Sequence, residues 1–160
     1  MIDRKQAILD GLENARAKLN NVLDRLTPEQ WEKPVQEGDA HWTARQILSH
    51  LYDAERGMIG QVIRIANGEE PIPPDFDLNR WNKRATEKLQ DKTVAELRQS
   101  LVETRARLKE ELAKLSDAQL DRIGRHSSLR MMSVEQILRE IGVHELEHGK
   151  NIAAAFGWSF

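Results

Sequence analysis

The stretch SVEQILREIGVHELEHGKNIAAAF, residues 133–156, decides the fold and points to the chemistry. Its apolar positions recur every three or four residues, which places them on one face of an α-helix. His144 and His148 fall in this row, where aliphatic core residues are expected. Two imidazoles one helical turn apart form a two-histidine metal ligand set, and burying them without partners is unfavourable. We therefore expect the chain to bind a metal ion.

The same periodicity extends outward from this stretch and predicts further helices. Prolines gather in the segment 69–77, which holds three of the five in the chain and is expected to be a rigid, extended crossover. No segment is expected to form a strand. The remaining helices are predicted over 3–26, 43–66, 78–89 and 93–115. Predicted helix N-caps are Thr43, Thr93 and Ser133, the last two with Glu96 and Gln136 at capping-box spacing.

These elements predict an all-α fold, a four-helix bundle made of two helical hairpins joined by a long crossover with an extra short helix. The chain also contains an internal echo, because residues 26–30 resemble 115–119 and residues 42–48 resemble 132–138. The echo indicates two hairpins related by a pseudo-two-fold axis. We expect one domain over residues 1–160.

Composition excludes several classes of function. The net charge of -2 gives no general attraction to nucleic acid or to an anionic membrane, and no apolar run is long enough to span a bilayer. The chain has no cysteine, so its metal ligands are restricted to His, Asp, Glu and water. A chain without cysteines and without an apparent signal peptide is compatible with the cytoplasm, where we expect the protein to act.

His144-Glu145-Leu-Glu-His148 formally matches the H-E-x-x-H helix of zinc proteases, in which the glutamate is the general base. Those enzymes need a third ligand, usually downstream, and no His, Asp or Glu follows His148. The third ligand is therefore expected upstream, and His50 is the best candidate because Ala54 and Gly57 nearby leave room for an ion. A histidine bonded to a carbonyl at a helix interface is the alternative interpretation of His50.

Carboxylates and other side chains offer further candidates. Glu140, Glu55 and Glu147 are rival ligands, with Glu147 expected to be solvated, and Glu140 and Glu145 are candidates for holding imidazole tautomers. Two residues are candidates for substrate binding. Trp81 could line a pocket, although core packing is the competing role. His126 is expected in a loop and is a candidate for the mouth of a pocket. The remaining tryptophans, Trp31, Trp42 and Trp158, are expected to seal bundle ends, and the arginines Arg122, Arg125 and Arg130 either bind an anion or are solvated.

The chain resembles the DinB/YfiT-like superfamily. The matching pieces cover nearly the whole chain in order: WTARQILSHL (42–51), DLNRWN (77–82), RIGRHS (122–127) and SVEQIL (133–138) followed by HELEH (144–148). The resemblance implies a four-helix bundle with a long crossover, and a divalent metal (Zn, Ni or Fe) held by one histidine of the second long helix and two of the last. By position these are His50, His144 and His148. The family name refers to expression induced by DNA damage, so the resemblance does not imply that the protein binds nucleic acid.

The resemblance also implies a class of reaction, because members with known activity include metal-dependent transferases and isomerases that use low-molecular-weight thiols. We therefore expect a thiol cosubstrate and an electrophilic substrate. A hydrolase that uses metal-bound water, and a metal-binding stress-associated protein without turnover, are the alternatives. The family often forms homodimers, so the aromatic tail of Phe156, Trp158 and Phe160 is expected either at a dimer interface or folded over the bundle end.

Overall fold

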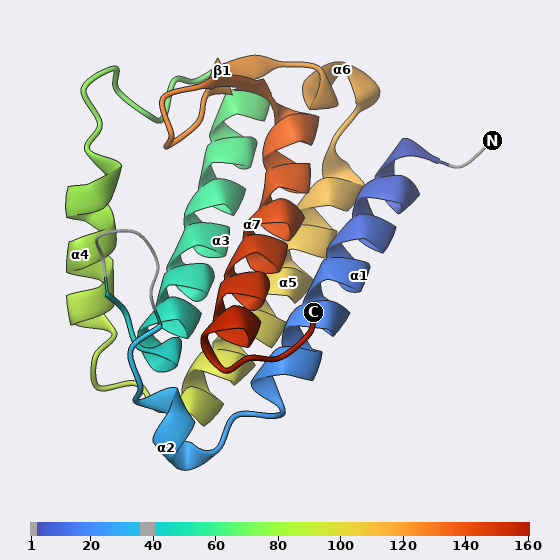
Figure 1. Ribbon diagram of the computed structural model, residues 1–160. Coiled ribbons are helices and arrows are strands. Elements are labelled where there is room, and N and C mark those ends of the chain that lie inside the picture. The colour runs from blue at the N-terminus through green and yellow to red at the C-terminus, as the bar shows by residue number, and fades with distance from the viewer. Residues whose placement is uncertain (1–2, 36–40) are drawn as a thin grey trace.

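The computed structural model describes residues 3–35 and 41–160 of the chain. Four long helices pack as a bundle, and a shorter helix lies beside α3 at the left of Figure 1. In chain order the elements are α1 (Arg4–Leu23), α2 (Pro28–Trp31), α3 (Ala44–Ala66), α4 (Leu78–Lys88), α5 (Val94–Lys114), α6 (Asp117–Leu120), β1 (Ile123–Arg125), β2 (Met131–Ser133) and α7 (Val134–Ala155). No helix in the described ranges is long and apolar enough to cross a membrane.

The predicted all-α four-helix bundle is confirmed, and most predicted helix boundaries agree with the structure to within a residue or two. Thr43, Thr93 and Ser133 are the N-caps of α3, α5 and α7, each in a complete capping box. The first helix ends at Leu23 instead of Leu26, because Asp24 caps it and the next residues form tighter turns.

One prediction was wrong: the chain does form strands. Ile123–Arg125 pairs antiparallel with Met131–Ser133 to make a hairpin whose turn includes Leu129 at φ 71°. Three-residue strands are too short to show the alternation of apolar and polar residues that identifies a strand in sequence. This hairpin joins α6 to α7 and closes the top of the bundle in Figure 1.

The internal echo in the sequence corresponds to a structural repeat. In each half a long helix leads through a one-turn helix and a β-type pairing into a second long helix. The pairing is the bridge Pro34↔Thr43 in the first half and Ile123↔Ser133 in the second. Both one-turn helices begin with capping boxes, Thr27 with Gln30 and Ser116 with Gln119. Repeated capping residues are therefore what made the two halves look alike.

Helix α7 occupies the middle of the bundle, in extensive contact with α1 on one side and α3 on the other. Its buried row runs through Gly142, Glu145 and Gly149, whereas His144 and His148 flank that row. The expectation that His144 and His148 occupy core positions in place of aliphatic residues was therefore wrong, because both lie at the edge of the buried row. Glycine carries no side chain to signal burial in a sequence, yet Gly142 lies in this row and faces Ala15 of α1.

A buried cluster of ion pairs ties the four long helices together. Arg16 of α1 and Arg105 of α5 each bind both Glu55 of α3 and Glu145 of α7, with nitrogen–oxygen distances from 2.6 to 2.9 Å. Both carboxylates are almost fully buried. Because each long helix contributes one residue, this cluster fixes how the helices are rotated relative to one another.

Candidate metal centre

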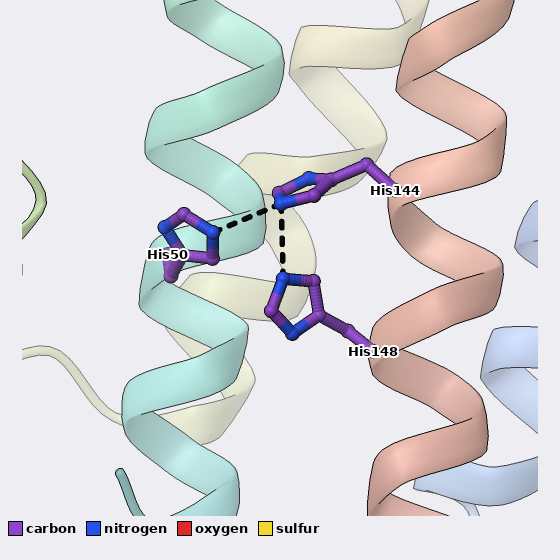
Figure 2. Close-up of side chains that lie close together, drawn as sticks. All are labelled: His50, His144 and His148. Carbon is purple, nitrogen blue, oxygen red and sulfur yellow. Dashed lines mark hydrogen bonds between the residues drawn. The ribbon is translucent and has the colours of Figure 1, made fainter. Parts of the chain in front are cut away.

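Three imidazole rings converge between α3 and α7 (Figure 2). His50 projects from α3, and His144 and His148 project from successive turns of α7. The Nε2 atom of His144 lies 2.9 Å from Nε2 of His50 and 2.9 Å from Nε2 of His148. One ligand nitrogen from each ring lies within 4.8 Å of the others, so the three residues that the sequence singled out do come together.

The contacts among these nitrogens cannot all be hydrogen bonds. The Nε2 atom of a neutral imidazole holds either one proton or one lone pair. His144 Nε2 can therefore form a hydrogen bond with only one of its two neighbours, as donor or as acceptor. In the other 2.9 Å contact, two lone pairs or two N–H groups face each other. A cation that accepts a lone pair from each ring removes this conflict, so the cluster fits a divalent metal ion.

Burial keeps two of the three rings, those of His50 and His144, neutral, as metal ligands need to be. Loss of solvation, with a smaller effect of His148, lowers the pKa of His50 to about 3. Loss of solvation, followed by the neighbouring histidines, holds the pKa of His144 well below its usual value. Near neutral pH both rings therefore present lone pairs, not charges.

The surroundings of the cluster differ from what the sequence indicated. Trp42 packs on His50, with ring centroids 4.8 Å apart, in addition to packing against the end of the bundle. Glu145, expected to hold an imidazole, instead accepts from Arg16 and Arg105 because it lies on another face of α7. Glu140 bonds Arg130 at 3.4 Å. Of the rival ligands, Glu55 belongs to the buried ion pairs and Glu147 is exposed as expected.

A cleft of about 470 Å³ begins at the histidines and extends along α3 toward the β-hairpin. His50 and His144 form part of its wall, so an ion held there would face the cleft. The crossover and α4 supply an apolar wall that includes Ile72, Phe76 and Trp81. The proline-rich segment predicted as a rigid crossover therefore has a definite role, since it builds one side of the cleft.

The candidate substrate-binding residues both line this cleft. Trp81 is 49 % exposed, so the core-packing role is wrong, and its Nε1–H donates to Asp53 Oδ2 at 2.9 Å. His126 is buried, and its Nδ1 accepts from the backbone N–H of Ser128. The three arginines do not form one anion site, because Arg125 donates to the Ile72 carbonyl while Arg130 binds Ser128 and Glu140.

Sequence reasoning overlooked Asp53 and Gln61, which also line the cleft. Helical spacing held the signal, because His50, Ala54, Gly57 and Gln61 are three or four residues apart and share a face of α3. That face is polar and small, unlike the apolar stripe that defines the core side of the same helix.

Comparison with known proteins agrees with the fold. Residues 11–152 match the model of the DinB superfamily, and the chain belongs to this family. The chain is 25% identical to YfiT from Bacillus subtilis (strain 168), described as a candidate metal-dependent hydrolase, over 98% of this chain and 88% of that protein.

Solved structures with the same architecture span nearly the whole chain. The structure of YfiT from Bacillus subtilis, reported as an unusual four-helix bundle topology, gives a TM-score of 0.71 at 25% identity and covers 99% of this chain and 92% of that one. The four-helix bundle protein TT2238 gives 0.68 at 21% identity, covering 94% and 98%. An uncharacterised protein from Escherichia coli UTI89 gives 0.63 at 15% identity, covering 98% and 96%, and shows the fold alone.

Proposed function

We propose that the protein is a divalent-metal-dependent enzyme that transfers a low-molecular-weight thiol to an electrophilic small molecule bound in the cleft. The observation that supports this proposal best is the placement of His50 and His144 in the wall of a cleft of about 470 Å³, because it gives a three-histidine site direct access to a small-molecule substrate. A purely structural metal site is normally closed by four protein ligands, whereas a catalytic site keeps a position open.

Each part of the chain around the site has a defined task. A divalent ion bound there supplies a Lewis acid that makes a thiol or a water molecule a better nucleophile at neutral pH. Trp42 packs on the ring of His50 and limits its rotation. Asp53 accepts from the Trp81 indole and is itself paired with Arg56, so the aromatic wall opposite α3 is held in place.

Hydrolysis on the same site is the second candidate, favoured by the description of YfiT as a candidate metal-dependent hydrolase. The structure argues against the peptidase form of this chemistry. The glutamate of the H-E-x-x-H match is Glu145, and its carboxylate is directed into the buried ion pairs with Arg16 and Arg105. Without that general base, a metal-bound water or thiol would give its proton to solvent, and the thiol is the more acidic of the two before it binds.

The two candidates are separated by a reaction screen on protein loaded with zinc, nickel or iron(II). We expect thiol consumption with a chloronitrobenzene electrophile in the presence of a small thiol such as cysteine or an aminosugar thiol. Cleavage of a nitrophenyl ester without thiol would favour hydrolysis, and inactivity in both assays would favour a binding protein without turnover.

Matched histidine variants test whether the activity belongs to the cluster. His144→Ala should abolish turnover with every metal. His41→Asn is the control, because His41 is exposed, lies outside the cluster and has a φ of 51° that asparagine tolerates. Equal losses in the two variants would contradict the assignment of the activity to this site.

A further inference from the structure

Two buried polar atoms of residues that line the cleft have no hydrogen-bond partner among the described residues. They are Oε1 of Gln61 and Nε2 of His126. The two residues are only 7% and 6% exposed, and both line the cleft. Buried polar atoms are nearly always paired in native proteins because leaving them unpaired is costly. A pair of them in one cleft indicates a bound group that satisfies both.

Helix α3 and the β-hairpin bring these two residues to the same cleft, Gln61 from the helix and His126 from the hairpin. Gln61 lies 11 residues beyond His50 on α3, which is about 16 Å along the helix axis. Gly124 of β1 lies so close to Ile65 that an added Cβ would come within 2.6 Å of the isoleucine side chain. His126 follows directly after β1, and it lines the same cleft as Gln61.

Local hydrogen bonds fix what His126 offers. The backbone N–H of Ser128 donates to His126 Nδ1 at 3.1 Å, so that nitrogen uses its lone pair and the ring proton lies on Nε2. Arg130 Nε donates in turn to Ser128 Oγ, which holds the turn together. His126 Nε2–H is therefore an unpaired donor in the wall of the cleft, and Gln61 Oε1 is an unpaired acceptor.

Apart from the metal ion proposed at the histidines, the charged side chains of the cleft wall balance one another and leave no net charge for a ligand to neutralise. A carboxylate that accepts from His126 Nε2 would leave Gln61 Oε1 without a donor, and an ammonium group that donates to Gln61 Oε1 would leave His126 Nε2 without an acceptor. Each charged side chain in the wall already has an opposite partner, in the pairs Asp53–Arg56 at 2.8 Å, Arg130–Glu140 at 3.4 Å and Arg64–Glu69 at 3.6 Å.

We propose that Gln61 and His126 form a recognition subsite for an uncharged group that has both a hydrogen-bond acceptor and an N–H or O–H donor, that is, an amide or a hydroxyl. This subsite rests on the proposed function in one respect, because the reacting end of the same molecule lies at the histidines. The body of the substrate lies along the aromatic wall, where the Phe76 and Trp81 ring centroids are 5.9 Å apart. The preferred substrate therefore carries a neutral polar group in addition to its apolar body and its reacting atom.

The first test measures binding, not turnover. Alkyl hydroxamates bind zinc through their two oxygens, and a series of polymethylene chains of increasing length carries a variable tail along the cleft to the two residues. Calorimetric titration of zinc-loaded protein should show carboxamide or hydroxyl tails binding at least about tenfold tighter than methyl, carboxylate or ammonium tails. Comparison of the carboxamide with the hydroxyl identifies which of the two the subsite prefers.

Variants assign this preference to the two residues. Gln61→Met and His126→Phe should each remove it while leaving the affinity of the methyl-tailed compound unchanged. Gln6→Met is the matched control, because Gln6 is an exposed residue of α1 that bonds only to Asp10. Equal affinities for all tails in the wild-type protein would overturn the subsite and leave the metal centre standing.

A second measurement reads the subsite without metal. In nitrogen-15 spectra of the metal-free protein, millimolar acetamide or ethanol should shift the side-chain signals of His126 and Gln61, and acetate should not. If no hydroxamate binds the zinc-loaded protein, the proposed function fails, and the acetamide result alone decides the subsite. Absence of any shift, or an equal shift with acetate, would overturn it.

Discussion

At the scale of single residues, the three histidines of the site cannot satisfy one another by hydrogen bonds alone. Three ring nitrogens meet between α3 and α7, and one of them cannot serve both of its close neighbours with one proton or one lone pair. Burial by the surrounding helices also keeps His50 and His144 neutral. Neutral, converging lone pairs are the arrangement in which a cation is preferred to protons.

We predict that each ligand histidine is required for tight metal binding. His50→Ala, His144→Ala and His148→Ala should each weaken zinc or nickel affinity by roughly 100-fold or more, since loss of even an outer hydrogen-bond partner costs 10–100-fold. Calorimetric titration and the metal content of protein purified without chelators would measure the change. Full affinity in His50→Ala would instead direct the search for a third ligand to the carboxylates that line the cleft, Glu140 first.

The buried histidines also predict how stability depends on pH. Burial lowers the pKa of His50 to about 3 and that of His126 to about 4, against about 6.5 in the unfolded chain. Below pH 6.5 the unfolded state therefore binds more protons than the folded state, so stability is complete above that pH and is lost as the pH falls toward 4. Each such group contributes a slope of about 1.4 kcal/mol per pH unit within this window.

Urea denaturation of the metal-free protein between pH 7.5 and 5 would measure this slope, in a range where most carboxylates stay ionised. His50→Phe removes one of the two buried histidines and should therefore reduce the dependence of the unfolding free energy on pH. His41→Asn should leave that dependence unchanged. A free energy of unfolding that is constant from pH 7 to 5 would show that these rings are not held neutral in the fold.

At the scale of secondary-structure elements, the rotation of each long helix is what allows the site to form. Arg16, Glu55, Arg105 and Glu145 come one from each long helix and meet in the interior. Glu145 follows His144 directly in the chain, so fixing the carboxylate among the arginines also fixes the direction in which the imidazole leaves α7.

We predict that breaking this cluster destabilises the whole bundle. Arg105→Met leaves two buried carboxylates with one cation between them and should lower the free energy of unfolding by about 3–5 kcal/mol. Lys109→Ala, which removes the exposed pair with Glu13 on the same helix, should cost about 1 kcal/mol or less. Chemical denaturation measures both, and similar small losses would show that the buried cluster contributes no more than a surface pair.

The elements also show which features the sequence could predict. Long amphipathic helices and capping residues are local signals, so α3, α5 and α7 were found with their N-caps. The two-histidine turn of α7 was equally local. Glu55 and Glu145 were named as candidates near the metal, but their role as buried ion-pair partners was missed, because the arginines that bind them lie 39 to 129 residues away in the chain. Pairing over such separations leaves no pattern in a single sequence.

At the scale of the whole molecule, the site joins the two halves of the repeat. His50 belongs to the first helical hairpin, and His144 and His148 belong to the second. The crossover between the halves, at the left and top of Figure 1, forms the far wall of the cleft. The centre therefore cannot assemble until both hairpins have packed, and a metal ion bound there would stabilise the complete fold over either half.

The aromatic tail bears on how the whole molecule is assembled. Trp158 lies beneath the guanidinium of Arg25, 4.2 Å from the ring centroid, and beside Phe156 with ring centroids 5.2 Å apart. Phe160 rests on Gly149, where an added Cβ would meet its ring at 2.9 Å. These contacts place the tail over its own bundle end, the second of the two roles that the sequence left open, and a homodimer remains a prediction.

Deletion of Gly157 to Phe160 should therefore act on stability and not on assembly. The truncated chain loses the contacts of two aromatic rings and one cation–π pair, which we expect to cost about 1–3 kcal/mol because both rings are only partly buried. Denaturation would measure the loss, and sedimentation velocity would show the same oligomeric state as the full chain. If the wild type is a dimer and the truncated chain is a stable monomer, the tail is part of the interface, because loss of a cap alone leaves the association of folded chains unchanged.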